Sequence, residues 1–129
     1  MRTIKFRGKR LDGKGWIRDS YTLIQDGDGT WLHDNDVEKI DEDTLGQFTG
    51  LFDKNGKEIY EGDILGANGK IIGWVKGDVR GYCYDVVYIN HPTGEKSWSL
   101  YSTVVEDFND KIEVVGNIFD NQELLANHQ

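Results

Sequence analysis

The pattern of apolar and polar residues predicts short β-strands separated by turns along most of the chain. Over residues 3–7 the two kinds alternate. Ile4 and Phe6 fall on one face of the predicted strand, and Lys5 and Arg7 fall on the other. A period of two is typical of a strand with one face on the core, so the basic pair is expected to face solvent. The same alternation recurs further along, and we therefore expect a mainly β protein.

The N-terminal third of the chain predicts a β-meander. Residues 16–24 indicate a second, bent strand and residues 30–33 a third, with glycine-containing turns between them. An acidic run over residues 34–43 follows, with six carboxylates and one lysine. Because its strand propensity is poor, we expect a solvated loop with a short strand at its centre. A domain boundary is placed after this run, so that residues 1–46 form the N-terminal β-meander region.

The C-terminal part, residues 47–129, carries the remaining strand signals. Strands are expected where apolar residues lie between turns, over residues 71–75, 82–89, 97–101 and 111–119. Thr103 and Glu106 have capping-box spacing, which predicts one helical turn over residues 104–108. A short helix is expected after the last strand. Short strands with a helical turn before the last one resemble an SH3-type β-barrel, whose closure would remove exposed sheet edges.

One stretch organises this second part, residues 47–65, with the sequence QFTGLFDKNGKEIYEGDIL. Asn55 and Gly56 are a two-residue turn signal, because both tolerate the positive φ that a tight hairpin requires. Gly62 lies between two apolar pairs and predicts a bulge or a sharp bend between strands. By themselves these features indicate a hairpin followed by the start of a strand.

The same stretch resembles the signature of the YopX proteins, a family encoded by temperate phages and prophages. A second match lies at residues 113–125, and a third at the opening, where residues 4–8 are followed by Trp16. We take the matching positions as the signature residues: Gln47, Thr49, Gly50, Leu51, Asp53, Asn55, Gly56, Glu61, Gly62, Asp63, Gly116 and Asn117. The resemblance implies an SH3-type barrel for residues 47–129 and a phage context, and it implies no particular biochemical activity.

Charge is unevenly distributed along the chain. The net charge of the 129 residues is −8, but residues 1–18 carry a net +6 and the remainder −14. The charges could complement one another within one fold. They could also drive self-association, with the basic strand of one copy facing acidic surface on another. Overall acidity argues against a general nucleic-acid binder, which needs an electropositive footprint.

The composition also indicates where the protein works. Cys83 is the one cysteine and cannot form an internal disulfide, which suits a reducing compartment. The N-terminal residues lack the apolar segment of a signal peptide, and no apolar run is long enough to span a membrane. We therefore expect the cytoplasm of the host cell and no membrane partner.

The sequence contains no set of residues with catalytic or metal-binding spacing, so we expect no enzyme activity, no cofactor and no metal site. Cys83 and His91 are the one thiol–imidazole pair, and Cys83 lies in a strand that is expected to be packed. His33, Asp34 and Asp36 could form a weak divalent-cation site. That possibility keeps a metal-dependent enzyme that uses the acidic loop as an alternative.

Two groups of residues are candidates for binding. The predicted strand over residues 82–89 places three tyrosines on one face, which two tryptophans could extend, and the aromatic candidates are Tyr82, Tyr84, Tyr88, Trp74 and Trp98. Such a face is a contact surface if it lies outside a barrel, and core packing is the favoured interpretation. The basic candidates are Arg7, Lys9 and Arg10, within the basic residues 2–18.

The favoured hypothesis is a non-enzymatic phage accessory protein, a β-rich binding or interaction module that self-associates and contacts a host or phage protein. It rests on the absence of a catalytic set, the separation of charge and the aromatic strand. The first alternative is a nucleic-acid-binding module that uses residues 2–18. The second is the divalent-metal-dependent enzyme that uses the acidic loop.

Overall fold

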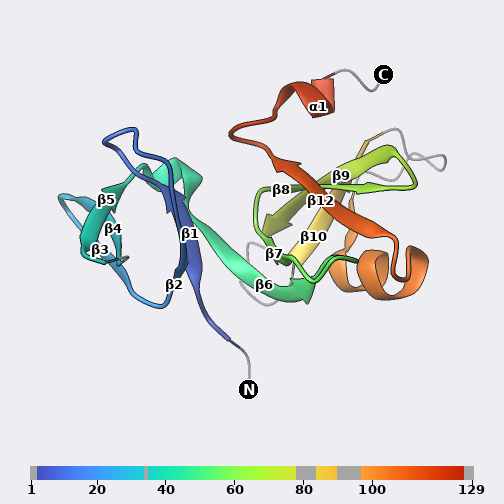
Figure 1. Ribbon diagram of the computed structural model, residues 1–129, viewed down its shortest axis with the longest axis horizontal. Coiled ribbons are helices and arrows are strands. Elements are labelled where there is room, and N and C mark those ends of the chain that lie inside the picture. The colour runs from blue at the N-terminus through green and yellow to red at the C-terminus, as the bar shows by residue number, and fades with distance from the viewer. Residues whose placement is uncertain (1–2, 34, 78–83, 90–96, 127–129) are drawn as a thin grey trace. The chain divides into compact units, whose positions relative to one another are not determined.

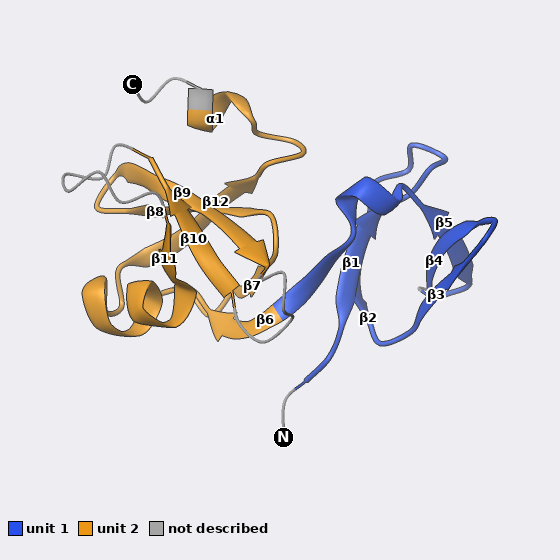
Figure 2. Ribbon diagram, turned by 180° about the vertical axis from the view of Figure 1, so that it is seen from behind, with its two compact units in different colours: residues 1–48 blue, residues 49–129 orange. Residues whose placement is uncertain are grey.

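The structure is a computed structural model that describes residues 3–33, 35–77, 84–89 and 97–126. Within these residues the chain forms short strands with few helical segments, which confirms the predicted mainly β fold (Figure 1). The chain divides into two compact units, Met1–Phe48 and Thr49–Gln129 (Figure 2). Each unit has its own hydrophobic core.

The first unit is built from short antiparallel strands and a 3₁₀ turn. They are β1 (Phe6–Lys9), β2 (Trp16–Ser20), β3 (Leu23–Asp26), β4 (Gly29–His33), β5 (Val37–Ile40) and η1 (Glu42–Thr44). β1 and β2 form a hairpin, and β1 also pairs with the start of β6 (Gly46–Phe52). β3, β4 and β5 form a three-stranded sheet in that order. The predicted meander is therefore divided between two sheets, because β1 and β2 lie in the sheet that contains β6. β5 is the short strand expected at the centre of the acidic run.

The predicted bent strand over residues 16–24 is in fact two strands that lie in different sheets. β2 ends at Ser20, and Asp19 beside it has a φ of 58°. The Ser20 hydroxyl donates to the Thr22 carbonyl oxygen at 2.8 Å and accepts from the His33 backbone N–H at 3.1 Å. These bonds fix the corner at which the chain leaves one sheet for the next.

The predicted solvent face of the first strand is buried, so that part of the sequence-based prediction is wrong. Lys5 and Arg7 are 8% and 2% exposed, whereas Ile4, before the start of β1, is 56% exposed. The Lys5 ammonium lies 4.9 Å from the centroid of the Phe48 ring, and the Arg7 guanidinium lies 5.0 Å from a ring of Trp16. Long basic side chains bury their hydrocarbon stems while the charge lies over an aromatic face, which is why this face can be covered.

The opposite face of the β1–β2 hairpin closes the core of the first unit. Ile17, Leu32 and Ile40 are at most 2% exposed, and Phe6 packs against them. Gly8 lies directly on this cluster, because a Cβ at that position would be 2.4 Å from the Ile40 Cδ1 atom. A residue without a side chain is therefore needed for β1 to approach β5 this closely.

The second unit continues from β6 through further antiparallel strands and two helical segments. They are β7 (Glu58–Tyr60), β8 (Asp63–Ala67), β9 (Lys70–Gly77), β10 (Tyr84–Tyr88), β11 (Ser97–Ser99), η2 (Ser102–Asp107), β12 (Ile112–Asn117) and α1 (Glu123–Ala126). Five of these strands form one sheet in the order β11-β10-β9-β8-β12. The last strand thus pairs with β8 rather than with its predecessor in the chain. α1 is the predicted terminal helix.

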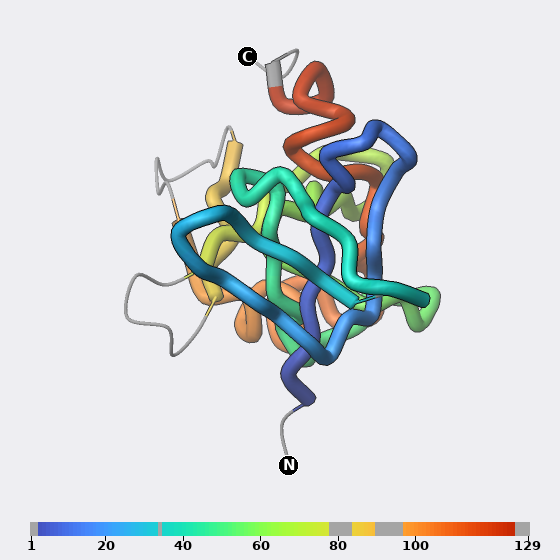
Figure 3. Tube along the Cα trace, turned by 90° about the vertical axis from the view of Figure 1, so that its left-hand side faces the viewer, coloured from blue at the N-terminus to red at the C-terminus, as the bar shows by residue number. Residues whose placement is uncertain are grey.

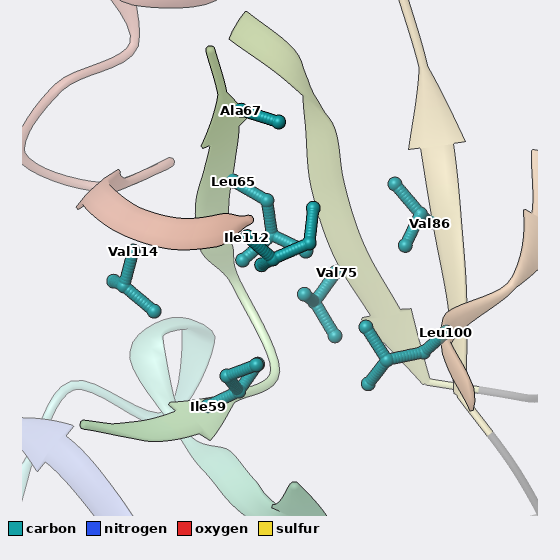
Figure 4. Close-up of a cluster of buried hydrophobic side chains, with 8 residues drawn as sticks. All are labelled: Ile59, Leu65, Ala67, Val75, Val86, Leu100, Ile112 and Val114. Carbon is teal, nitrogen blue, oxygen red and sulfur yellow. The ribbon is translucent and has the colours of Figure 1, made fainter. Parts of the chain in front are cut away.

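The main core lies on one side of this sheet, where β12, β8, β9 and β10 contribute alternate residues. Figure 4 shows its buried side chains, which are Ile59, Leu65, Ala67, Val75, Val86, Leu100, Ile112 and Val114. Each is at most 8% exposed. The alternating residues in the sequence therefore point in turn toward this core and toward the outer face of the sheet.

The helical turn predicted before the last strand is present as the π-helical segment η2. The Phe108 backbone N–H donates to the Thr103 carbonyl oxygen at 3.0 Å, a bond across five residues. The predicted capping role of Thr103 is wrong, because this residue lies inside the helix and is fully buried. Its hydroxyl donates to the Ser99 carbonyl oxygen at 2.9 Å and bonds the Tyr88 hydroxyl. It therefore ties η2 to β11 and β10.

Candidate functional site

One buried carboxylate, that of Asp53, holds the signature turn. Its Oδ1 atom accepts hydrogen bonds from the backbone N–H groups of Asn55 at 2.8 Å and Lys57 at 2.9 Å. Its Oδ2 atom accepts one from Val114 of β12 at 2.9 Å, 61 residues along the chain. Burial raises the pKa of Asp53, but the three backbone donors outweigh it and lower the pKa below the ordinary value. The ionised side chain therefore joins the turn to the last strand.

The signature glycines adopt backbone conformations that other residues take only with strain. Gly50, Gly56 and Gly62 have φ values of 87°, 80° and 91°. Gly62 also connects two other parts of the unit. Its N–H donates to the Val75 carbonyl oxygen at 2.8 Å, and its carbonyl oxygen accepts from the Ile118 N–H at 2.8 Å. The bend predicted here is a junction between β9 and the end of β12.

Two polar signature side chains bond to neighbouring backbone rather than face solvent. The Thr49 hydroxyl donates to the Ile59 carbonyl oxygen at 2.7 Å, which ties β6 to β7. The Asp63 Oδ2 atom accepts from the Tyr60 N–H at 2.8 Å, and Asp63 is 1% exposed. The Asp63 carboxylate therefore accepts a turn amide, as acidic side chains in turns commonly do.

Three further signature residues lie against backbone or core. Glu61 lies against Gly77, where a Cβ would be 2.1 Å from the Glu61 Oε2 atom. Gln47 pairs with Phe6 across β1 and β6. Leu51 is half-buried against the core of the second unit.

The second signature match, Gly116 and Asn117, closes the C-terminal segment. The Asn117 Oδ1 atom accepts from the N–H groups of Phe119 at 3.0 Å and Asp120 at 2.9 Å. The Asn117 N–H in turn donates to the Asn121 Oδ1 atom at 3.1 Å. A Cβ at Gly116 would lie 2.5 Å from that same oxygen. Glycine at position 116 therefore leaves room for the Asn121 side chain, which accepts the Asn117 N–H.

The two tyrosine candidates that the structure describes lie on the core side of the sheet. Tyr84 and Tyr88 are half-buried and pack against the main core, on either side of the fully buried Val86. The Tyr88 hydroxyl also bonds Thr103. Tyr82 lies outside the described residues. The two described tyrosines therefore occupy the core positions that the sequence analysis favoured for this face.

Of the two tryptophan candidates, Trp98 shares the face of the tyrosines, because it stands opposite Val86 in the register of β10 and β11, and Trp74 does not. Trp74 stands opposite Val87 in the register of β9 and β10, so it lies on the face away from Val86 and is half-buried. Trp98 is 46% exposed on the short strand β11. The structure therefore divides the predicted aromatic surface between the two faces of the sheet.

The basic candidates are engaged within the first unit. Besides the buried Arg7, Lys9 is half-buried with its ammonium 5.8 Å from a ring of Trp16. The Arg10 guanidinium contacts Asp12 at 2.7 Å and Glu38 at 3.3 Å. The bond from Arg10 lowers the pKa of Asp12. These contacts reduce the positive charge that residues 2–18 could offer to nucleic acid.

Among the described residues, no group of three or more His, Cys, Asp or Glu side chains is placed to hold a metal ion. Asp34, one of the three predicted cation ligands, lies outside the described part of the chain, as do Cys83 and His91. The described signature carboxylates Asp53 and Asp63 are used as backbone acceptors.

The sequence analysis missed a groove on the second unit, between the signature turn, η2 and β12. One part of it is a hollow of about 300 Å³ lined by Leu51, Phe52, Asp53, Lys54, Val104, Val105, Asn109, Asp110 and Ile112. Phe52 and Val105 are 51% and 39% exposed at its rim. The pattern of apolar and polar residues gives no sign that Phe52 and Val105 are exposed. Apolar residues beside a turn or in a helix are usually buried, so both would be expected in the core.

A second hollow of about 290 Å³ adjoins the first and shares Lys54 and Asp110 with it. Its lining is Lys54, Gly66, Ala67, Asn68, Gly69, Lys70, Ile71, Asp110, Lys111, Glu113 and Val115. Gly66 contributes to its depth, since a Cβ there would lie 3.3 Å from the Val115 Cγ1 atom. We call the two hollows together the groove; its first part is mostly apolar and its second carries three lysines.

These features define a small mainly β protein of two units, with buried turn-forming residues and a surface groove. A family model described as "YopX protein" matches residues 5–126. The chain therefore belongs to the YopX family, as its signature residues predict.

The comparison with solved structures supports the same fold. The chain is similar to a structure titled "Crystal structure of protein EF1440 from Enterococcus faecalis", with 23% sequence identity and a TM-score of 0.52. The match covers 97% of this chain and 99% of the other. At this identity the likeness shows the fold alone. A search of curated proteins gave no match. In the described part of the chain, no helix has the length and apolar character needed to cross a membrane.

Proposed function

We propose that this YopX-family protein is a non-enzymatic binding module that self-associates and serves as an accessory protein of a temperate phage or prophage in the host cytoplasm. The observation that carries the proposal is the groove of the second unit, with exposed Phe52 and Val105 at its rim. Exposed apolar side chains beside a concave surface are typical of contact sites between proteins.

The proposal includes an SH3-type barrel as the scaffold of the groove. Four consecutive strands, β8 to β11, pair in chain order, a helical segment follows, and β12 returns to pair with β8. This connectivity supports the barrel that the sequence predicts. Such a scaffold leaves the segments around η2 and the signature turn free to form a contact surface.

The buried polar residues support binding over catalysis. Asp53, Asp63 and Asn117 use their side-chain oxygens to accept backbone hydrogen bonds. The Thr49 hydroxyl donates to the Ile59 carbonyl oxygen. Groups committed in this way are poorly placed to abstract or deliver protons.

The test is native mass spectrometry and sedimentation of the gently purified protein. The expected result is a homo-oligomer without added mass. In the variant Val105→Asp, a charge at the apolar part of the groove should weaken association at least about tenfold, because the contact would bury an unpaired carboxylate. The control is Tyr101→Asp, an exposed aromatic residue 58% accessible beside η2 that does not line the groove.

A monomer at all concentrations with no retained partner would contradict the proposal. Added mass from bound nucleic acid would instead favour the alternative of a nucleic-acid-binding module that uses residues 2–18. Added mass from a divalent ion would favour the metal-dependent enzyme that uses the acidic loop.

A further inference from the structure

The three-stranded sheet of the first unit, β3-β4-β5, has one covered edge and one open edge. Its strands can be followed in Figure 3 in the blue to teal part of the trace. At the β5 edge, the Lys39 carbonyl oxygen accepts from the Leu11 N–H at 3.1 Å, and the Asp41 N–H donates to the Lys9 carbonyl oxygen at 2.8 Å. At the other edge, β4 is the one strand of the described chain that pairs with β3.

The bonds at the covered edge show which backbone groups of β3 point away from the sheet. The Lys39 carbonyl oxygen points away from β4, so its neighbours Glu38 and Ile40 bond to β4. The same alternation, carried across β4 to β3, directs the backbone groups of Ile24 toward β4 and those of Leu23 and Gln25 outward. Leu23 and Gln25 therefore present N–H and C=O groups at the open edge.

The open edge lacks the features that usually protect a sheet edge from pairing. Natural edges are commonly blunted by charged residues, prolines or bulges. β2, an edge strand of the other sheet, has them: its pairing with β1 contains a bulge, and it carries Arg18 and Asp19. Residues 21–25 have the sequence YTLIQ, without a charge or a proline. β3 is therefore well suited to receive another strand.

The open edge is complementary to a second copy of itself. In an antiparallel pair centred on Ile24, Leu23 of each copy would stand opposite the partner's Gln25, and each such pair would exchange both of its hydrogen bonds. Asp26 would stand opposite the partner's Thr22, so no two like charges would meet. Ile24, which is 40% exposed, would stand opposite the partner's Ile24. A register shifted by two residues would place Ile24 opposite Thr22 or Asp26 instead, so the apolar contact selects this pairing.

The outer face of the sheet carries a row of side chains that ends at this edge. Ile24 pairs with Trp31 and Trp31 pairs with Lys39, so the three lie side by side across the sheet. The Lys39 ammonium lies 5.5 Å from a ring of Trp31 at the inner end of the row. At the outer end, no strand of the described chain lies beside Ile24. Pairing of two copies would join the two rows and bury both isoleucine side chains.

We propose that β3 pairs with β3 of a second copy about a two-fold axis, so that the two sheets become one continuous antiparallel sheet. The inference rests on the proposed self-association and adds to the groove a contact that lies wholly within the first unit. Because both copies use the same surface, the contact is isologous and closes at a dimer. Backbone hydrogen bonds provide the affinity, as in other cases of strand addition, and the Ile24 pair fixes the register.

Gln25→Pro tests the backbone part of this contact. Proline has no N–H group and is tolerated in an edge strand where the N–H faces away from the sheet. Association should weaken at least about tenfold, because each copy loses a donor to its partner. Gln25→Ala is the matched control, since it removes the same side chain but keeps the N–H, and it should associate like the wild type. Sedimentation equilibrium measures both dissociation constants, and circular dichroism checks the fold.

Ile24→Lys and Ile24→Glu test the register and do not depend on whether the sheet accommodates a proline. In each variant two like charges would face each other across the two-fold axis, so each should associate at least about fivefold more weakly than the wild type. An equimolar mixture should recover association as a heterodimer, because a lysine then faces a glutamate. Isotope labelling of one variant gives the heterodimer a distinct mass in native mass spectrometry.

The outcomes separate this contact from the groove. A wild-type protein that stays monomeric contradicts self-association and the strand pairing with it. An oligomer that Val105→Asp weakens and the β3 variants leave unchanged contradicts only the strand pairing. An oligomer that the β3 variants weaken and Val105→Asp leaves unchanged supports the strand pairing and contradicts the groove as a site of self-association.

Two further results would overturn the strand pairing. Equal weakening by Gln25→Pro and Gln25→Ala would assign the effect to the side chain rather than to the backbone N–H. A mixture of Ile24→Lys and Ile24→Glu that forms no more heterodimer than chance would exclude the pairing centred on Ile24. A different polypeptide that copurifies with the wild type and is lost in Gln25→Pro would show that the edge receives a strand of another protein instead of a second copy.

Discussion

At the scale of single residues, the signature side chains work mainly on the chain's own backbone. Asp53 accepts three backbone hydrogen bonds, and Asn117 accepts two, each within or beside a turn. A buried N–H group that loses its acceptor costs more than the bond contributes, because water cannot replace the partner. A short motif can therefore recur in a family for reasons of folding alone.

The Asp53→Asn variant should lose about 1–3 kcal/mol of unfolding free energy, as measured by urea denaturation at neutral pH. The asparagine side chain keeps one acceptor oxygen and turns an NH2 group toward one of the three backbone donors. The control is Asp107→Asn, an exposed residue of η2, which should change stability by less than about 0.5 kcal/mol. Equal stability of both variants would contradict the role given to Asp53.

The stability gap between the wild type and Asp53→Asn should also depend on pH. Because the folded-state pKa of Asp53 lies below the ordinary value of 3.8, its contribution is fully present above that value. It should shrink as the pH falls through the lowered folded-state pKa. The urea midpoints of both proteins, measured at several pH values, show whether this stability difference shrinks in acid. A difference that grows as the pH falls would contradict the prediction.

Gly116→Ala should destabilise the protein by about 1–3 kcal/mol, because the new methyl group would overlap the Asn121 side chain. Gly27→Ala is the matched control, since no atom lies within 4 Å of a Cβ there. Thermal unfolding followed by circular dichroism compares the two. A similar melting temperature for both variants would show that the Asn121 side chain moves away without cost.

At the scale of secondary-structure elements, the strands were easier to predict than the connections between them. The alternation in β10 and β12 identified both strands, because a sheet with one face on a core imposes a period of two. The break between β2 and β3 was not identified, since it depends on bonds from Ser20 to Thr22 and His33. The position of η2 was predicted, but the role of Thr103 inside it was not.

Asn117→Ala should loosen the segment that ends in α1 while leaving the main core in place. The substitution removes the acceptor for the N–H groups of Phe119 and Asp120. Hydrogen exchange of the described amides over residues 119–125 should therefore become faster, and exchange in β9 should change little. The exposed residue Gln122 supplies the control variant Gln122→Ala. Unchanged protection over residues 119–125 would contradict this account.

At the scale of the whole molecule, the two cores share no residue. Leu32 and Ile112 are each fully or almost fully buried, one in each core. Leu32→Ala should cost about 2–5 kcal/mol through the cavity that it leaves, and hydrogen exchange should report the loss mainly in residues 3–48. Ile112→Ala should act in the same way on the second unit. Equal acceleration of exchange in both units by either variant would show that they unfold together.

Local sequence pattern is enough to predict the mainly β class, most strand positions, the terminal helix and the family. Those features follow from the local pattern of apolar residues and from turn-forming residues, both of which can be seen within a few neighbouring positions. The sequence also favoured the core side for Tyr84 and Tyr88, because large aromatic residues in a small β unit are usually packed.

The face of each strand that is covered, and the distant groups that meet, depend on how the strands pack in three dimensions. Lys5 and Arg7 are buried because aromatic rings cover them, and the 61-residue separation of Asp53 from Val114 leaves no local trace. The groove exists for the same reason, since it depends on the signature turn, η2 and β12 lying together. Burial and long-range pairing are properties of the packed chain, so the candidate binding surface could be found only there.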